Sequence, residues 1–208
     1  EDCVASLKRW SVKDSMGVKL ASFLSDYKIV DAKTFQIVLK EKFGPMLQAL
    51  GKPSVAVPFM MPARVAATDP NTQISEYIGS GPFVLKLDEW KPGEKIVFLK
   101  NTRYKPRAEP ASGLSGGKVV MLDRVEWVWI PDSQTQIDAL IKGEIDMVGS
   151  VDFDQLPLLE KTKGIKILKA TAPGQYTFRM NWLQPPFNDV RVRRAAAYAL
   201  SQPDFLQA

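Results

Sequence analysis

The sequence predicts a mixed α/β protein, and three observations lead to that prediction. From Asp123 onward, the apolar pattern follows the order strand, helix, strand, helix, strand, which is typical of a parallel sheet with crossover helices. Two alternating apolar segments, 83–87 and 95–99, flank the turn-forming residues 91–94 and predict a hairpin. The first third mixes short helical and strand patterns, which favours an α+β region there.

Short elements are predicted in the first third. Asp2 is expected to cap a helix that runs through Trp10, with Val4 and Leu7 on its apolar face. A short helix with proline in its first turn and glycine after its end is expected at 45–51. The remaining predicted elements are a helix over 18–24 and strands over 27–29 and 34–39.

A strand with two tryptophans is predicted before residue 131. Val125, Trp127 and Trp129 alternate along it, so we interpret the two indoles as one packed face of the sheet. Asp132 or Ser133 is expected to cap the helix that follows, because short polar side chains can accept the free N–H groups of a first helical turn.

The alternation of helices and strands continues beyond that helix. Gly143 is expected to end it, since glycine readily adopts the left-handed conformation found after helices. Strands are predicted at 145–148 and 165–168, and Asp152 is expected to cap a helix between them.

Composition excludes several kinds of chemistry. The 208 residues carry a net charge of +5, no histidine and a single cysteine. Without histidine the chain lacks the usual general base, the Ser–His and Cys–His nucleophile pairs and the commonest metal ligand. We therefore expect no catalytic residue, no metal site and no cofactor. The basic residues are spread along the chain, so we expect no nucleic-acid partner.

The ends of the predicted strands hold the first candidate ligand contacts. In open α/β sheets, ligands bind beyond the carboxyl ends of the strands. The residues predicted there are Asp132, Ser133, Gly149, Ser150 and Asp152. Helix capping alone is the competing interpretation for the two aspartates.

The stretch 185–200 is the most distinctive in the chain. Its two prolines favour an extended approach to a helix, which Asn188 or Asp189 can cap. Arg191, Arg194 and Tyr198 fall on one face of that helix. The opposite face is an apolar stripe at helical spacing, formed by Val192, Ala195, Ala196 and Ala199.

Several segments, in order, are similar to motifs of the family 5 extracellular solute-binding proteins of ABC transporters, which include oligopeptide-, dipeptide- and nickel-binding proteins. Two departures stand out: 101–104 lacks the proline and tryptophan of the family's usual Asn-Pro-x-Tyr-Trp, and Ser201-Gln202 stands where the family usually has Asp-Arg. The matching segments are 1–9, 79–85, 101–104, 139–146, 176–181 and 185–200.

This resemblance implies a fold similar to the type II periplasmic-binding proteins, in which two lobes close over a ligand. The chain would be an internal fragment with three parts. Residues 1–76 would form part of a small α+β subdomain of lobe one, and 77–173 its main α/β part. Residues 174–208 would form the hinge crossover and the start of a truncated lobe two.

The resemblance also implies a function. The full-length protein would be a periplasmic, or extracellular and membrane-associated, binding component of an ABC importer, and not an enzyme. Its partners would be a small solute, such as a peptide, and the membrane subunits of the permease. With one lobe incomplete, the 208-residue chain is expected to bind ligand weakly or not at all and to be prone to self-association.

Three residues near the implied hinge are further ligand candidates. Asn181 and Trp182 follow the predicted crossover strand, and Tyr176 precedes them near the hinge. An indole suits varied peptide side chains at low entropic cost. Packing at the hinge is the alternative for both aromatic residues. Arg191, Arg193 and Arg194 are interpreted as a solvated helix face, with contact to a peptide carboxylate as the alternative.

A hydrolase, for example one acting on phosphate esters, is the competing function. Glu144 and Asp146 are two residues apart on a predicted strand and would share a face. Such a carboxylate pair could supply acid and base without histidine.

Overall fold

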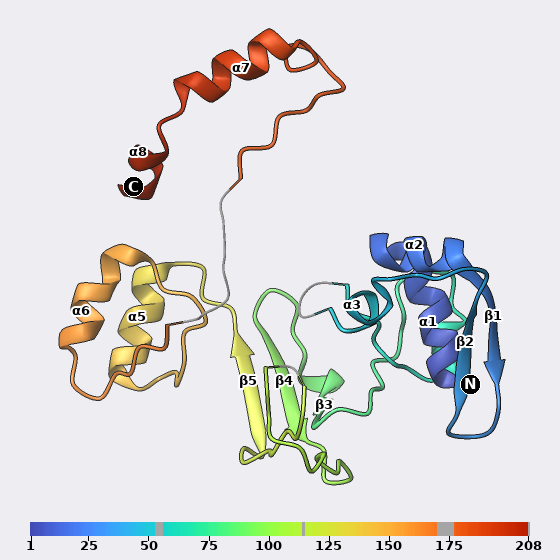
Figure 1. Ribbon diagram of the computed structural model, residues 1–208. Coiled ribbons are helices and arrows are strands. Elements are labelled where there is room, and N and C mark those ends of the chain that lie inside the picture. The colour runs from blue at the N-terminus through green and yellow to red at the C-terminus, as the bar shows by residue number, and fades with distance from the viewer. Residues whose placement is uncertain (53–55, 114, 170–176, 208) are drawn as a thin grey trace. The chain divides into compact units, whose positions relative to one another are not determined.

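The computed structural model describes residues 1–52, 56–113, 115–169 and 177–207 (Figure 1). The chain divides into two compact units, Glu1–Val148 and Gly149–Ala208. Helices and strands both occur, so the mixed α/β class is confirmed. The boundaries at 76 and 173 stay predictions.

Two helices open the first unit. α1 (Asp2–Lys13) buries Val4, Leu7 and Trp10, as its spacing predicts. Asp2 does not cap α1: Glu1 occupies that position, and the Asp2 carboxylate accepts a 2.8 Å hydrogen bond from the N–H of Ala63. Ala63 begins α4 (Ala63–Ala66), so Asp2 satisfies a free N–H of a different helix.

Asp14 joins α1 to α2 (Ser15–Phe23). Its N–H donates to the Trp10 carbonyl at 3.0 Å and ends α1. Its carboxylate accepts hydrogen bonds from the N–H groups of Met16 and Gly17, both at 2.9 Å, and caps α2. One residue therefore ends one helix and begins the next.

Gly17 lies where α2 packs closely against the last turn of α1. A Cβ built on Gly17 would lie 2.8 Å from the Ser11 Cα and 3.1 Å from the Trp10 ring. Alanine usually stabilises a helix by about 1 kcal/mol relative to glycine. Here we expect Gly17→Ala to destabilise the protein by about 1–2 kcal/mol, because backbone atoms would have to move apart.

Urea unfolding would measure this effect, with Ser22→Ala as the control on the exposed side of the same helix. Ser22→Ala should change the unfolding free energy by less than about 0.5 kcal/mol. A stabilised Gly17→Ala variant would show that the contact between α1 and α2 is looser than described.

A hairpin completes the first core. β1 (Leu24–Ile29) pairs antiparallel with β2 (Phe35–Leu39), in a register that sets Ile29 opposite Phe35. Beside it lies α3 (Met46–Leu50), the short helix that the sequence predicts. The buried cluster that these elements share consists of Val4, Leu7, Trp10, Leu20, Tyr27, Phe43 and Ala49.

A three-stranded antiparallel sheet forms the rest of the ordered strands in the first unit (Figure 1). Its order is β3 (Phe83–Leu85), β4 (Lys95–Lys100), β5 (Arg124–Val128), with the 3₁₀ helix η1 (Leu87–Glu89) after β3. The predicted hairpin is confirmed, and Gly93 at its turn has a φ of 79°. Val97 in the central strand is fully buried.

The prediction of a parallel sheet is wrong for the described residues. Both sheets are antiparallel, and the predicted strands at 145–148 and 165–168 are irregular segments. A strand needs a neighbouring backbone to satisfy its N–H and C=O groups, and none of the described strands pairs with either segment. Glu144 and Asp146, both exposed, therefore lack the shared strand face on which the hydrolase alternative depends.

α5 (Ser133–Lys142) follows β5 and has the predicted ends. Asp132 caps it, and Gly143 ends it with a φ of 75°. Its buried residues are Ile137 and Ala139.

The second unit is helical where it is regular. η2 (Phe153–Gln155) leads into α6 (Leu156–Lys161), so the helix expected after Asp152 is present. α7 (Val190–Ala199) and α8 (Gln202–Gln207) follow. Asp189 caps α7, with its carboxylate accepting from the Arg191 N–H at 2.8 Å. In the predicted apolar stripe of α7, Val192 and Ala196 are half-buried, whereas Ala195 and Ala199 are exposed.

Candidate ligand-contacting residues

Asp132 and Ser133 lie at the start of α5 in the first unit. One carboxylate oxygen of Asp132 accepts from the Thr135 hydroxyl at 2.6 Å and from the Thr135 N–H at 2.7 Å. These two hydrogen bonds, the hydroxyl first, hold the pKa of Asp132 below its usual value. The capping role is confirmed, and contact with a ligand stays a prediction. Ser133 is half-buried in the first turn.

Gly149, Ser150 and Asp152 lie in the second unit and are all exposed. The expectation that the first two follow a strand is wrong, because 145–148 forms none among the described residues. Asp152 directly precedes η2. The argument from strand ends therefore no longer supports Gly149 and Ser150, and their contact with ligand stays a prediction.

The remaining candidates belong to the segment before α7. Tyr176 lies outside the described residues. Asn181 turns its side chain onto its own backbone, where its oxygen accepts from the Leu183 N–H at 3.1 Å. Trp182 is 69% exposed, and the Arg193 guanidinium lies 5.4 Å from its ring centroid. Hinge packing therefore does not bury this indole in the second unit.

Three arginines at the start of α7 have different surroundings. Arg191 pairs with the helix cap Asp189 at 2.6 Å, and Arg194 is exposed. Arg193 is half-buried, and its Nη1 donates to the carbonyls of Phe187 and Asn188 at 2.6 and 3.1 Å. A solvated face describes Arg194 but is wrong for Arg193, whose guanidinium is held by protein groups.

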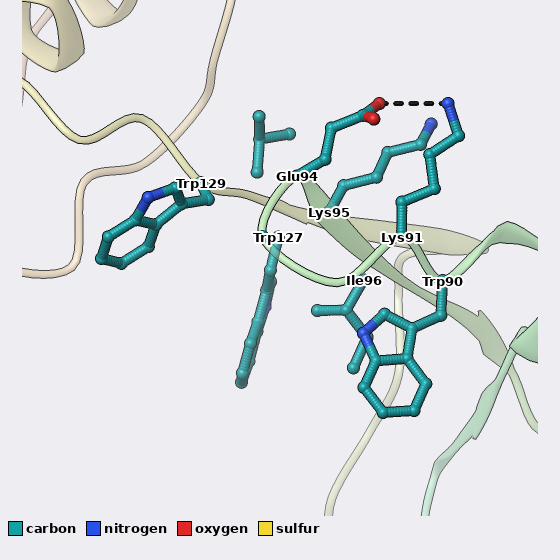
Figure 2. A pocket seen from close by; sticks show the side chains of 9 residues that line it. Trp90, Lys91, Glu94, Lys95, Ile96, Trp127 and Trp129 are labelled. Carbon is teal, nitrogen blue, oxygen red and sulfur yellow. Dashed lines mark hydrogen bonds and ion pairs between the residues drawn. The ribbon is translucent and has the colours of Figure 1, made fainter.

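The structure also contains an aromatic hollow that the sequence did not predict. Figure 2 shows the indoles of Trp90, Trp127 and Trp129 around the turn between η1 and β4. The hollow has a volume of about 290 Å³, just below the range of about 300–1,000 Å³ that is typical of ligand pockets. Its lining residues are Trp90, Lys91, Gly93, Glu94, Lys95, Ile96, Trp127, Val128 and Trp129.

The predicted packed face of tryptophans is wrong. Trp127 contacts Phe98 edge-on, with ring centroids 5.4 Å apart, but remains 64% exposed. Trp129 is 69% exposed and lies just beyond β5, where its backbone N–H donates to the Glu94 carbonyl at 2.7 Å. Alternation placed both indoles on one side of the sheet, but it gave no information on what covers that side.

The candidate residues are divided between the two units: Asp132 and Ser133 belong to the first, Gly149, Ser150, Asp152, Asn181 and Trp182 belong to the second, and Tyr176 lies outside the described residues. The hydrogen bonds of Asp132 and Asn181, and the ring contact of Trp182, stay within their own segments. None of the sequence-predicted candidates lines the aromatic hollow. Among the described residues, no group of three or more acidic or cysteine side chains could hold a metal ion, and no helix is long and apolar enough to cross a membrane.

Comparison with known proteins places the whole chain in one family. The family model described as bacterial extracellular solute-binding proteins, family 5 Middle, matches residues 1–208. The chain belongs to the family 5 solute-binding proteins. This family 5 chain carries motifs similar to those of the family in order, apart from the departures at 101–104 and 201–202, and the helix after the double proline is present as α7.

Two curated relatives are longer than this family 5 chain. The "Probable peptide ABC transporter periplasmic-binding protein y4tO" of Sinorhizobium fredii is 40% identical over 210 residues, which cover 100% of this chain and 39% of the relative. The glutathione-binding protein GsiB of Escherichia coli K12 is 29% identical over 175 residues, 84% of this chain and 31% of GsiB. The chain therefore spans between about a third and two fifths of these relatives.

A solved structure supports the fold. The dipeptide-binding protein of Pseudoalteromonas sp. SM9913, in complex with Met-Leu, superposes with a TM-score of 0.69 at 17% identity. The match covers 93% of this chain and 36% of that protein. The family 5 chain thus has part of the fold of a type II periplasmic-binding protein.

Proposed function

We propose that this protein is the periplasmic solute-binding component of an ABC importer. The observation that carries the proposal is the match of the family model to all 208 residues. In such a component, two lobes close over the solute by hinge motion, and the closed form delivers it to a permease in the membrane. No step of this cycle requires a catalytic group, a metal or a cofactor.

The proposed ligand is a peptide or a similar small solute. The more similar of the two curated relatives is named for peptide transport, the second binds glutathione, which is itself a tripeptide, and the solved neighbour holds Met-Leu. The proposed partners are therefore a short peptide and the permease subunits of the transporter.

Trp182 is the side chain that we propose as the main contact of this chain with the peptide. Its indole is 69% exposed and belongs to the crossover segment before α7. A flat aromatic surface contacts varied side chains with little loss of conformational freedom. The other proposed contacts are Asp132, Ser133, Gly149, Ser150, Asp152, Tyr176 and Asn181.

Equilibrium dialysis with labelled Met-Leu and labelled glutathione tests this proposal on the protein at its natural length. We expect saturable binding of at least one of the two. Trp182→Ala should raise the dissociation constant of the bound ligand about tenfold, equivalent to about 1.4 kcal/mol. Trp129→Ala is the matched control, because its indole is equally exposed but is not one of the proposed contacts, and it should leave the dissociation constant unchanged.

The two parts of the proposal fail separately. Absence of saturable binding of both ligands would contradict a peptide-importing function. Binding by the unaltered protein together with an unchanged dissociation constant in Trp182→Ala would retain the function and reject Trp182 as a contact.

A further inference from the structure

Arg193 makes three contacts that fix its guanidinium within the second unit. Its Nη1 donates to the carbonyls of Phe187 and Asn188, at 2.6 and 3.1 Å. Its guanidinium lies over the Trp182 ring, 5.4 Å from the centroid. The two carbonyls belong to the turn before α7 and the indole to the crossover segment, so one side chain joins three parts of the chain.

The position of Arg193 would be unfavourable without these contacts. It is the fourth residue of α7, and a positive charge near a helix N-terminus is opposed by the helix dipole. The neighbouring Arg191 is neutralised by the cap Asp189, and Arg194 remains in solvent. Arg193 instead receives compensation from two carbonyl oxygens and the electron-rich face of an indole.

A second ring contact supports the same segment. Phe178 and Phe187 meet edge to face, with ring centroids 6.3 Å apart and an interplanar angle of 81°. Phe187 therefore contacts the start of the crossover with its ring and Arg193 with its carbonyl. The segment that carries Trp182 is therefore held at two points, by Arg193 of α7 and by Phe187 in the turn before α7.

These contacts leave much of the indole free. The guanidinium lies on one side of the Trp182 ring, yet the residue remains 69% exposed. An exposed tryptophan on an unsupported loop would sample several rotamers, and ordering it on ligand binding would cost free energy. A ring already held by a cation on one face is oriented before the ligand arrives.

We propose that Arg193 is a positioning residue that holds the Trp182 indole as a flat surface for a bound peptide. The proposal rests on the importer function proposed above. Arg193 acts through Trp182 and does not itself contact the peptide. This proposal differs from the alternative in which Arg193 binds the carboxylate of the peptide.

The test combines a spectroscopic signature with binding in the protein at its natural length. Tryptophan is labelled with ¹⁵N, and the Trp182 indole resonance is identified by its loss in Trp182→Phe. We expect Arg193→Met to shift this resonance and to raise the dissociation constant of Met-Leu or glutathione about fivefold. Arg193→Lys keeps the charge without the planar fork and should give intermediate values of both.

Arg194→Met is the matched control, since it removes the same charge from the adjacent, exposed position. It should change neither the indole resonance nor the dissociation constant. Circular dichroism of each variant checks that the helical content is retained, and Arg193→Lys provides the comparison if Arg193→Met loses it.

Three results would overturn the proposal. An unshifted Trp182 resonance in both Arg193 variants would show that the stack does not orient the ring. A shifted resonance with unchanged affinity would show that the orientation does not serve binding. Failure of the unaltered protein to bind either peptide would reject the importer function and this inference with it, which distinguishes that case from the first two.

Discussion

Leu20→Ala is expected to lower the free energy of unfolding by about 3 kcal/mol. Leu20 is fully buried in the cluster formed by α1, α2 and the first hairpin, next to residues such as Trp10 and Phe43. Truncation removes the transfer free energy of the lost methyl groups and leaves a cavity among side chains that relax only in part. Urea unfolding followed by circular dichroism would measure the change.

Val18→Ala is the control for that measurement. Val18 lies on the same helix two residues earlier and is 50% exposed, so its truncation should cost less than about 1 kcal/mol. Equal losses from the two substitutions would contradict the assignment of Leu20 to the core.

Asp14→Ala is expected to cost about 2–3 kcal/mol, the second large effect. The Asp14 side chain is only 4% exposed, accepts the N–H groups of Met16 and Gly17, and is paired with the Lys52 ammonium. Loss of a helix cap costs about 1 kcal/mol, and leaving Lys52 without its partner adds to this. Asp14→Asn should lose less, because the amide oxygen can still cap α2.

Asp31→Ala is the matched control for this substitution. Asp31 also accepts a backbone hydrogen bond, from the Lys33 N–H at 2.7 Å, but it is exposed in the turn between β1 and β2. Its removal should cost less than about 1 kcal/mol. A loss as large as that of Asp14→Ala would show that burial and the Lys52 pair contribute little.

The stabilisation by Asp14 should depend on pH. Burial raises the pKa of this carboxyl, but the hydrogen bond from Lys52, the N–H groups of Gly17 and Met16 and the charge of Lys52 outweigh it, so the pKa is lowered. A lowered folded-state pKa gives stability that is fully present above the unfolded value of about 3.8 and is lost as the pH falls through the folded value. Unfolding curves of the native protein and Asp14→Ala should therefore converge below pH 3.8. A constant difference down to pH 2 would contradict the lowered pKa.

Local signals predicted the ends of helices well. Asp132 and Gly143 bound α5 as expected, because a cap and a left-handed glycine act within a few residues of the helix they bound. The prediction that Asp2 caps α1 was wrong for a related reason. A carboxylate near the start of a helix can accept a hydrogen bond from any free N–H within reach, and the Asp2 carboxylate accepts from the N–H of Ala63, 61 residues away.

The predicted strands that the structure confirms all pair with another described strand, either in a local hairpin or, for β5, with the more distant β4. The hairpin of β3 and β4 is local and was predicted, as were β1 and β2. The segments 145–148 and 165–168 have the apolar composition of strands, yet none of the described strands lies against either of them. Composition indicates that a segment is suited to a sheet, whereas a ladder also requires a second backbone.

The sequence indicated which residues are candidates for ligand contact, but it did not indicate which side chains lie next to them. The exposure of Trp182 agrees with its proposed role, but its contact with Arg193 spans eleven positions, with no short motif to indicate it. The hollow around Trp129 depends on the hairpin turn that brings Trp90 and Glu94 beside the end of β5. Both features arise from chain reversals, and side-chain pattern alone does not specify them.

Capture of an intact solute is the central claim, and calorimetric titration with recovery of the ligand tests it most directly. The protein at its natural length is titrated with Met-Leu and with glutathione, and the ligand is then released by denaturation and analysed by chromatography. The account predicts saturation at about one molecule per protein, with the ligand recovered unchanged. Absence of binding heat for both ligands, or hydrolysis products that accumulate with time, would contradict it.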